Sequence, residues 1–230
     1  TSQPMTRPVT LWDEYTGRFD AVETVDVRSR VSGYLTKVHV KDGQDVAAGE
    51  KLFTIDPRPY ERAVAQARAE LALAKVRVAN AKLDVERGRP LLDRKVISEK
   101  TFDDRENVVR EGEAQVLVAE NRVATAELEL AYTEITAPIA GRLGRTVVTL
   151  GNWIGGGSGS TPTLVNTIVR QDPIHLYFDI SELDALKYKR LMADRGATAS
   201  PSLLSIPVGV GLPDEKGYPH TGRLDFVDNR

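Results

Sequence analysis

The sequence predicts a multidomain protein of mixed α and β structure. A long antiparallel helical hairpin, paired as a coiled coil, interrupts a small β-sandwich, and an antiparallel β-barrel forms from the two ends of the chain. Three observations lead to this prediction. A 16-residue segment recurs at an offset of 108 residues, a heptad pattern fills most of the interval between the copies, and β-rich segments with turn signals occupy both ends. The 230 residues suffice for two or three small domains.

The internal repeat aligns residues 31–46 with residues 139–154 without a gap. Four positions are identical in the two copies: Gly33 and Gly141, Leu35 and Leu143, Val40 and Val148, and Gly43 and Gly151. Glycine is suited to turns that need a positive φ. One copy is too short to bury a core, so we expect the copies to combine into one small two-fold sandwich. The alternative is a chance similarity between two β-hairpins.

A heptad pattern of small and apolar residues runs through the interval between the copies. The first series is Tyr60, Val64, Ala67, Leu71, Ala74, Val78, Ala81, Val85, Gly88 and Leu92, and the second is Val109, Gly112, Val116, Ala119, Val123, Ala126 and Leu130. This spacing is typical of a coiled-coil seam. We therefore expect two closely packed helices of roughly 33 to 35 residues, each about 50 Å long.

The two helices are joined by a short link near residues 94–98. Pro90 interrupts the hydrogen bonding of the first helix close to its end. Ser98 is a favourable N-cap for the second helix, and Glu99 places negative charge at the positive end of that helix. Because the link is short, the helices are expected to run antiparallel.

Charge is segregated between the two helices. Residues 58–97 carry 10 basic and 5 acidic side chains, a net charge of +5, whereas residues 98–131 carry 4 basic and 9 acidic side chains, a net charge of −5. The opposite net charges indicate attraction between the two helices of one hairpin and favour side-by-side packing of several hairpins. The alternative is that these charges belong to an ordinary solvated surface. The whole chain has a net charge of −2, which argues against nucleic-acid binding.

The ends of the chain predict the strands of the barrel. We expect β structure at residues 9–27, 175–180, 206–212 and 222–227, and a short helix from Ser181 and Glu182 through Met192 to Gly196. No run of residues reaches the roughly 18 to 20 apolar residues of a membrane span, and no signal peptide is visible. Because the chain stops within a β segment, we expect it to be a fragment of a longer protein.

The sequence shows no convincing catalytic, cofactor or metal site. There are no cysteines, and the three histidines are far apart in the chain, at His39, His175 and His220. The glycine-rich residues 155–160 are not followed by the Gly-Lys-Ser/Thr of a phosphate-binding loop. The prediction is therefore a protein that is not an enzyme and that binds no cofactor or metal.

Several motifs resemble one protein family. Residues 31–35, 41–46 and 49–57 are similar to the first half-motif of a lipoyl domain, residues 130–144 to the second, and residues 171–174 to the entry into a β-barrel. Together with the hairpin, they resemble the periplasmic adaptors, or membrane fusion proteins, of resistance-nodulation-division (RND) efflux pumps, in the HlyD-like family. The resemblance covers essentially the whole chain.

The resemblance implies a domain division. The helical hairpin spans residues 58–131, a biotinyl-lipoyl-like domain comprises residues 29–57 and 132–169, and an incomplete β-barrel domain comprises residues 1–28 and 170–230. It further implies that a membrane-proximal domain, a leader and any lipid anchor lie outside this chain.

A docking motif of the family maps onto the hairpin tip. Adaptors that bind a TolC-type outer-membrane channel carry an arginine, a leucine four positions later and a serine seven positions after that; Arg87, Leu91 and Ser98 match this spacing. The resemblance implies that Leu91 enters an apolar notch of the channel and that Arg87 reaches its carbonyl groups or acids. The alternative is that Leu91 packs in the coiled coil, Arg87 is solvated and Ser98 only caps its helix.

The resemblance implies a periplasmic protein, associated with the inner membrane, that links a proton-driven RND transporter to a TolC-type channel for multidrug export. It also implies self-association into a hexameric ring. One alternative is an adaptor of an ATP-driven or type I secretion exporter. A biotin or lipoyl carrier is disfavoured because residues 58–131 occupy the place of the carrier's lysine hairpin. A coiled-coil scaffold without a channel role is the third alternative.

Overall fold

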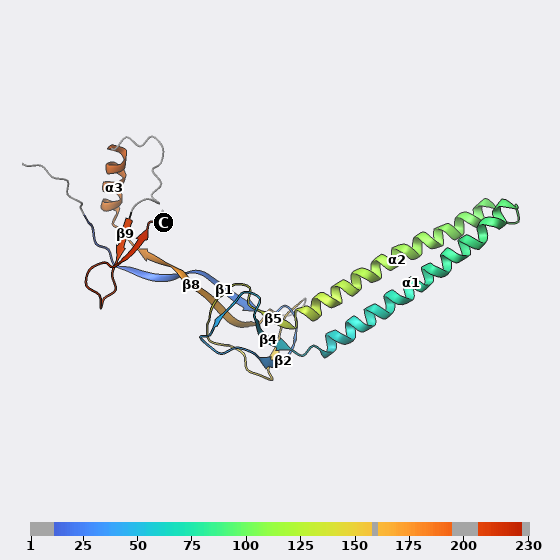
Figure 1. Cartoon of the computed structure of the whole chain (residues 1–230), viewed down its shortest axis with the longest axis horizontal. Helices are drawn as coiled ribbons and strands as arrows, with labels where there is room; N and C mark the ends of the chain where they lie inside the picture. The colour runs from blue at the N-terminus through green and yellow to red at the C-terminus, as the bar shows by residue number, and fades with distance from the viewer. Residues whose placement is uncertain (1–11, 158–160, 195–206, 227–230) are drawn as a thin grey trace, which may run out of the picture. The chain divides into compact units, whose positions relative to one another are not determined.

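The structure is a computed structural model that describes residues 12–157, 161–194 and 207–226. Its elements are, in chain order, β1 (Gly17–Arg28), β2 (Gly33–Val38), β3 (Asp45–Val46), β4 (Lys51–Ile55), α1 (Arg58–Asp93), α2 (Glu99–Ala131), β5 (Glu134–Thr136), β6 (Gly141–Leu143), β7 (Trp153–Ile154), β8 (Leu164–Phe178), α3 (Glu182–Asp194), β9 (Pro207–Val210) and β10 (His220–Arg223) (Figure 1). The chain divides into two compact units, one of residues 19–175 and one of residues 1–18 with 176–230.

The larger unit contains a sandwich of two four-stranded sheets. Their strand orders are β1-β8-β6-β3 and β5-β4-β2-β7. Both sheets contribute to one buried core, which contains Val27, Val31, Leu35, Val40, Val46, Leu52, Phe53, Ile55, Ile135, Ala137, Leu143, Ile154, Val165 and Ile168. Burial of this apolar surface is the main force that holds the two sheets together.

The strand registers confirm the predicted two-fold relation between the repeat copies. The β2–β7 pairing places Gly33 opposite Ile154 and Tyr34 opposite Trp153. The β3–β6 pairing places Gly141 opposite Val46 and Arg142 opposite Asp45, which is the same pairing with the two copies exchanged. Each copy therefore pairs its first repeat strand with the second strand of the other copy, and neither copy forms a sheet by itself.

The turns of the two copies are equivalent as well. The amide of Leu35 donates to the carbonyl of Asn152 at 2.9 Å, and the equivalent amide of Leu143 donates to the carbonyl of Gln44 at 2.9 Å. Gly43 and Gly151 have φ values of 76° and 84°. Side chains with a Cβ rarely adopt this region, which explains why glycine occupies both turns.

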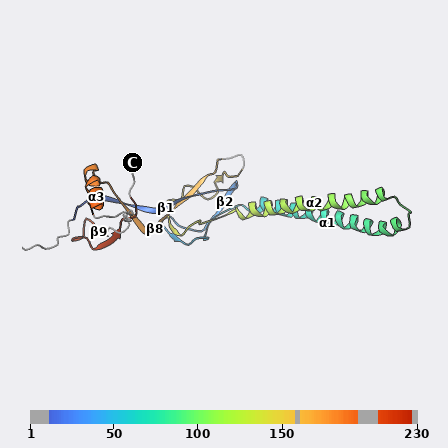
Figure 2. The ribbon, with the colours of Figure 1, turned by 90° about the horizontal axis from the view of Figure 1, so that it is seen from above.

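The helices α1 and α2 form an antiparallel hairpin between strands β4 and β5, which pair with each other (Figures 1 and 2). All residues of the two predicted seams are buried or half-buried, so the heptad prediction is confirmed. The closest approach lies at Gly112, where an added Cβ would be 2.9 Å from Cγ2 of Val78. Small seam residues therefore allow the close packing that the sequence predicts.

The smaller unit contains helix α3 and a two-stranded antiparallel sheet of β9 and β10. The hydroxyl of Ser181 accepts a hydrogen bond from the amide of Asp184 at 3.2 Å, as expected for a cap. Helix α3 covers Glu182–Asp194, so it begins at the predicted residue and includes Met192 as predicted, while Gly196, the predicted terminator, lies outside the described residues.

The two C-terminal strands differ in their bounds from the prediction. Strand β9 covers Pro207–Val210 and ends before the predicted residues 211 and 212, while residue 206 lies outside the described residues. Strand β10 covers His220–Arg223, because His220 already pairs with Val210, with only two residues between it and the turn at residues 213–217. The strand ends before the predicted residues 224–226, while residue 227 lies outside the described residues. Within the described residues this unit shows no closed barrel, so the barrel stays a prediction. No described helix is long and apolar enough to cross a bilayer.

Candidate docking site at the hairpin tip

The hairpin tip is a rigid turn built from the C-terminal end of α1. The amide of Lys95 donates to the carbonyl of Leu92, and the amide of Val96 donates to the carbonyl of Leu91, both at 2.8 Å. Lys95 has a left-handed backbone with a φ of 56°. These two hydrogen bonds and the left-handed residue define a Schellman motif. In this motif, carbonyl groups of the last helical turn that have no donor within the helix accept hydrogen bonds from the residues that follow.

The structure places the three predicted docking residues on either side of this turn. Arg87 and Leu91 lie one helical turn apart on the same face of α1. The Arg87 side chain is 74% exposed, and its Nη1 lies 3.8 Å from Oδ1 of Asp84, a long ion pair that leaves the guanidinium accessible. Leu91 is 36% exposed. Arg87 and Leu91 are therefore accessible to a partner protein.

Ser98 has a structural role at the start of α2. Its hydroxyl accepts a hydrogen bond from the amide of Thr101 at 3.2 Å and lies 2.8 Å from the Thr101 hydroxyl. The predicted N-cap is therefore confirmed. The side chain is exposed, so capping and contact with a partner are compatible.

The packing beneath the tip involves Phe102, which lies outside the two seams predicted from the sequence. This side chain is 7% exposed, and its Cδ2 would lie 3.5 Å from a Cβ added at Gly88. Arg105 crosses to the other helix, where its Nη1 donates to the carbonyl of Asp84 at 3.1 Å. Phe102 precedes Val109 by seven residues, so the heptad spacing itself was the signal that could have extended the seam to the tip.

The tip is cationic and exposes apolar side chains. Residues 87–100 contain five basic and two acidic side chains, a net charge of +3: Arg87, Arg89, Arg94, Lys95 and Lys100 against Asp93 and Glu99. All seven are exposed. Val96 is 67% exposed and was also missed by sequence reasoning. The tip therefore combines accessible apolar groups with positive charge.

Ion pairs along the hairpin confirm the predicted attraction between the helices. Three of them recur at seven-residue intervals: Arg68 with Glu127 at 2.6 Å, Lys75 with Glu120 at 3.1 Å and Lys82 with Glu113 at 2.7 Å. In a fourth, Arg122 Nη1 lies 3.1 Å from Glu70 Oε2, with the charges of the two helices reversed. Exposed pairs contribute little energy each, but their regular spacing favours one register of the two helices.

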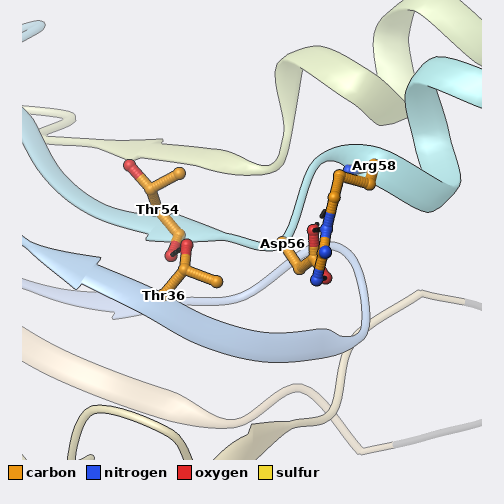
Figure 3. Close-up of polar contacts among 4 residues, drawn as sticks. All are labelled: Thr36, Thr54, Asp56 and Arg58. Carbon is orange, nitrogen blue, oxygen red and sulfur yellow. Dashed lines mark hydrogen bonds and ion pairs between the residues drawn. The ribbon is translucent and has the colours of Figure 1, made fainter.

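The other end of the hairpin is fixed to the sandwich. The Arg58 guanidinium donates to Asp56 from Nε at 2.8 Å and from Nη2 at 2.6 Å (Figure 3). These hydrogen bonds hold the pKa of Asp56 below its usual value. Beside them, the Thr36 hydroxyl donates to the carbonyl of Thr54 at 3.0 Å and joins β2 to β4. The first turn of α1 is thus held against the strand that precedes it.

A second contact fixes the root of the hairpin, which is the end where α1 and α2 join the sandwich. The hydroxyl of Tyr60 donates to the carbonyl of Ser32 at 2.7 Å, and burial raises the pKa of Tyr60. Across the root, the Arg30 guanidinium lies 4.9 Å from the ring centre of Tyr132, which follows α2. Both helices are therefore attached to the sandwich through side chains as well as through the chain itself.

The histidines and carboxylates that the structure describes do not gather into a metal-binding cluster. Among the described residues, no group of three or more His, Asp or Glu side chains is arranged to hold a metal ion. His39 Nε2 lies 2.8 Å from the Thr54 hydroxyl, and His220 Nε2 lies 3.0 Å from Oε1 of Glu215, in different compact units. The exposed surface of the hairpin is suited to protein contact, since it offers charge, apolar groups and a rigid turn.

Fold and surface together define a mixed α and β protein that carries a helical hairpin on an intertwined sandwich. Residues 23–167 match the family described as "RND MFP, barrel-sandwich hybrid domain". The chain therefore belongs to the membrane fusion proteins of RND systems, a family for which multidrug efflux is characteristic.

Individual relatives agree with this assignment. The chain is 40% identical over 168 residues to the multidrug resistance protein MdtA of Proteus mirabilis, covering 73% of this chain and 40% of MdtA. It is 35% identical over 228 residues to the efflux pump periplasmic linker BepD of Brucella suis, covering 99% of this chain and 56% of BepD. The chain thus spans about half the length of these relatives or less.

A solved structure is also similar. A MacA-MexA chimeric protein that contains the α-hairpin domain of Pseudomonas aeruginosa MexA matches with 30% identity and a TM-score of 0.53. The match covers 75% of this chain and 56% of the chimera.

Proposed function

We propose that this chain is part of a periplasmic adaptor that links a proton-driven RND transporter of the inner membrane to a TolC-type channel of the outer membrane. The observation that carries the proposal is the rigid, exposed hairpin tip with Arg87, Leu91 and Ser98, in a chain that belongs to the RND membrane fusion proteins. The protein acts in the periplasm, in association with the inner membrane, and forms a sealed conduit for drug export. Its role is structural rather than catalytic.

In this proposal the sandwich is a biotinyl-lipoyl-like domain that serves as a mount for the hairpin. A carrier domain would present a lysine on a tight turn between its two halves. Here the 36-residue helix α1 and the 33-residue helix α2 connect β4 to β5 instead. This connection supports an adaptor over a biotin or lipoyl carrier. The terminal segments belong to the adaptor's β-barrel domain.

Docking follows from the chemistry of the tip. Leu91 enters an apolar notch on the end of the channel, where its removal from water stabilises the complex. Arg87 donates to carbonyl groups or carboxylates beside the notch, since its guanidinium offers several donors and stays charged. Ser98 holds the first turn of α2 in place, so that the turn does not become disordered when the tip is engaged.

Hairpins associate side by side in the assembled pump, and the family resemblance suggests a ring of six. Exposed apolar side chains on both helices support lateral contacts: Leu73, Val76 and Leu83 on α1, and Leu117, Val118 and Leu128 on α2. The positive α1 of one copy would meet the negative α2 of the next. The same charge complementarity that pairs the helices within a hairpin then acts between copies.

The test is dye accumulation in cells whose native copy is replaced by the full-length protein with Leu91→Asp. A carboxylate that must be buried in an apolar notch is strongly unfavourable, so we expect accumulation to rise to the level of cells without the adaptor. Leu150→Asp is the matched control, because Leu150 is 59% exposed and lies in the sandwich unit outside the hairpin. Normal efflux by an abundant, folded Leu91→Asp protein would refute tip docking.

Co-purification identifies the inner-membrane partner. We expect an RND transporter to be recovered with the full-length protein from membranes after chemical cross-linking. Recovery of an ATP-driven exporter in its place would assign the adaptor to another class of pump.

A further inference from the structure

We infer that Val96 is a second apolar docking residue, which together with Leu91 forms a two-residue contact that enters an acid-rimmed apolar notch on the outer-membrane channel. The inference rests on the proposed docking of the hairpin tip and adds a residue outside the Arg87, Leu91 and Ser98 motif.

The backbone of the tip couples Val96 to Leu91. The amide of Val96 donates directly to the carbonyl of Leu91 at 2.8 Å. In a Schellman motif these two positions commonly make a hydrophobic contact with each other. The two side chains therefore belong to one turn with a fixed backbone, and little conformational entropy is lost when the pair is buried.

Val96 is more exposed than the other apolar residues of the turn. It is 67% exposed and Leu91 is 36% exposed, whereas Ile97 and Leu92 are half-buried. A single exposed apolar residue on a protein surface needs no explanation. Here, however, the turn fixes two of them at the free end of a 36-residue helix, between Arg87 and Ser98 of the proposed docking motif.

Lys95 gives the turn a feature that a purely structural turn would lack. Its φ of 56° lies in the left-handed region, where glycine is strongly favoured and a residue with a Cβ is disfavoured. A lysine at this position places a cation next to Val96 in spite of that preference. With Arg87, Arg89, Arg94 and Lys100, and against Asp93 and Glu99, it gives the segment that contains the apolar pair a net charge of +3.

This combination selects the chemistry of the partner. An apolar pair in a turn of net positive charge is complementary to a protein notch with apolar walls and a rim of carboxylates or helix C-terminal carbonyl groups. Such a partner buries Leu91 and Val96 and at the same time neutralises the flanking charges. We assign this partner to the channel rather than to a second adaptor, because the lateral surfaces proposed for adaptor contacts lie on the sides of the helices.

The experiment measures recovery of the channel with the full-length adaptor from cells, for Val96→Asp, Leu91→Asp and Val147→Asp. Val147 is the matched control, since it is a valine that is 65% exposed and lies in the sandwich unit. We expect Val96→Asp to reduce channel recovery by at least about tenfold, because a carboxylate would have to be buried without a partner. Val147→Asp should leave recovery unchanged.

The outcomes separate the inference from the proposed function. Loss of recovery with Leu91→Asp but not with Val96→Asp overturns the role of Val96 and leaves tip docking intact. Normal recovery with both variants contradicts tip docking itself. If Val96→Asp lowers the amount of adaptor, Val96→Thr, which keeps the shape and adds a hydroxyl, decides in its place. A photo-cross-linking residue at position 96 should form adducts with the channel; adducts only with lipid or another adaptor would refute the inference.

Discussion

The close approach of the two helices at Gly112 leads to a prediction whose magnitude can be worked out. Replacing a helical glycine by alanine stabilises an exposed helix by about 1 kcal/mol. At Gly112, however, the new Cβ would lie 2.9 Å from Cγ2 of Val78, nearer than real Cβ contacts allow. Val78 is 8% exposed and β-branched, so it has essentially one rotamer available in a helix. The helices must therefore move apart to accept the methyl group.

Such overpacking costs about 1–3 kcal/mol, so Gly112→Ala should be destabilising by up to about 2 kcal/mol after the helix propensity is subtracted. Gly88→Ala is the matched control. Its new Cβ would meet the flexible end of Arg105 at 2.8 Å and Phe102 at an ordinary 3.5 Å. The guanidinium can move aside at the cost of its exposed hydrogen bond to the Asp84 carbonyl, so this variant should keep part of the gain of up to about 1 kcal/mol.

The assay is thermal unfolding of both variants of the full chain, followed by circular dichroism of the helices. One kcal/mol corresponds to roughly 2–4 °C in Tm for a chain of this size. We expect the Tm of Gly88→Ala to exceed that of Gly112→Ala by several degrees. An equal increase of Tm in both variants would show that the seam at Gly112 has room for a side chain, which would contradict close packing of the two helices at this position.

Three further predictions concern the turn, the ion pairs and the root of the hairpin. Lys95→Gly should raise the Tm by removing a left-handed backbone cost of about 1–2 kcal/mol, partly offset by glycine's entropy in the unfolded chain; a lowered Tm would contradict the Schellman geometry. Lys75→Glu should destabilise by up to about 1 kcal/mol by facing Glu120, and adding Glu120→Lys should restore the Tm; no recovery would refute the pairing. The hydrogen bonds from Arg58 lower the pKa of Asp56 in the folded protein. The contact therefore stabilises the folded state fully above the unfolded-state pKa of about 3.9, and this stabilisation is lost as the pH falls through the lower pKa of the folded state. The Tm difference between the parent and Asp56→Asn should thus be larger at pH 7 than at pH 3, and a constant difference would contradict the contact.

The hairpin could be predicted from the sequence in most of its detail. Its seams depend on contacts between residues three and four positions apart, and a heptad pattern reports such contacts directly. Val64, Val78 and Ala126 are buried as the pattern requires. The capping role of Ser98 was visible for the same reason, since an N-cap depends only on the next three residues.

The sandwich could be predicted only in outline. The repeat offset showed that two copies exist, but not that each copy pairs with strands of the other. The strands concerned are too short to show an alternating pattern, since β3 and β7 contain two residues each. Their registers, such as Tyr34 opposite Trp153, depend on residues more than 100 positions apart in the chain. No local signal in a sequence specifies such a contact.

Part of the candidate site was also hidden from sequence reasoning. Arg87 and Leu91 were found through a spacing, but Val96 and Lys95 were not. A Schellman motif is usually recognised by glycine at its left-handed position, and this turn has a lysine there. The exposure of Val96 follows from that turn, so it became visible only in three dimensions.

Photo-cross-linking from position 91 of the full-length protein in living cells tests the central claim most directly. A photoreactive residue in place of Leu91 should form its main adduct with an outer-membrane channel protein, identified by mass spectrometry. The same residue at position 150, on an exposed loop of the sandwich unit, should not form this adduct. If position 91 reacts only with other copies of the adaptor or with lipid, the hairpin tip is not a channel-docking site, and the proposed link to an outer-membrane channel is wrong.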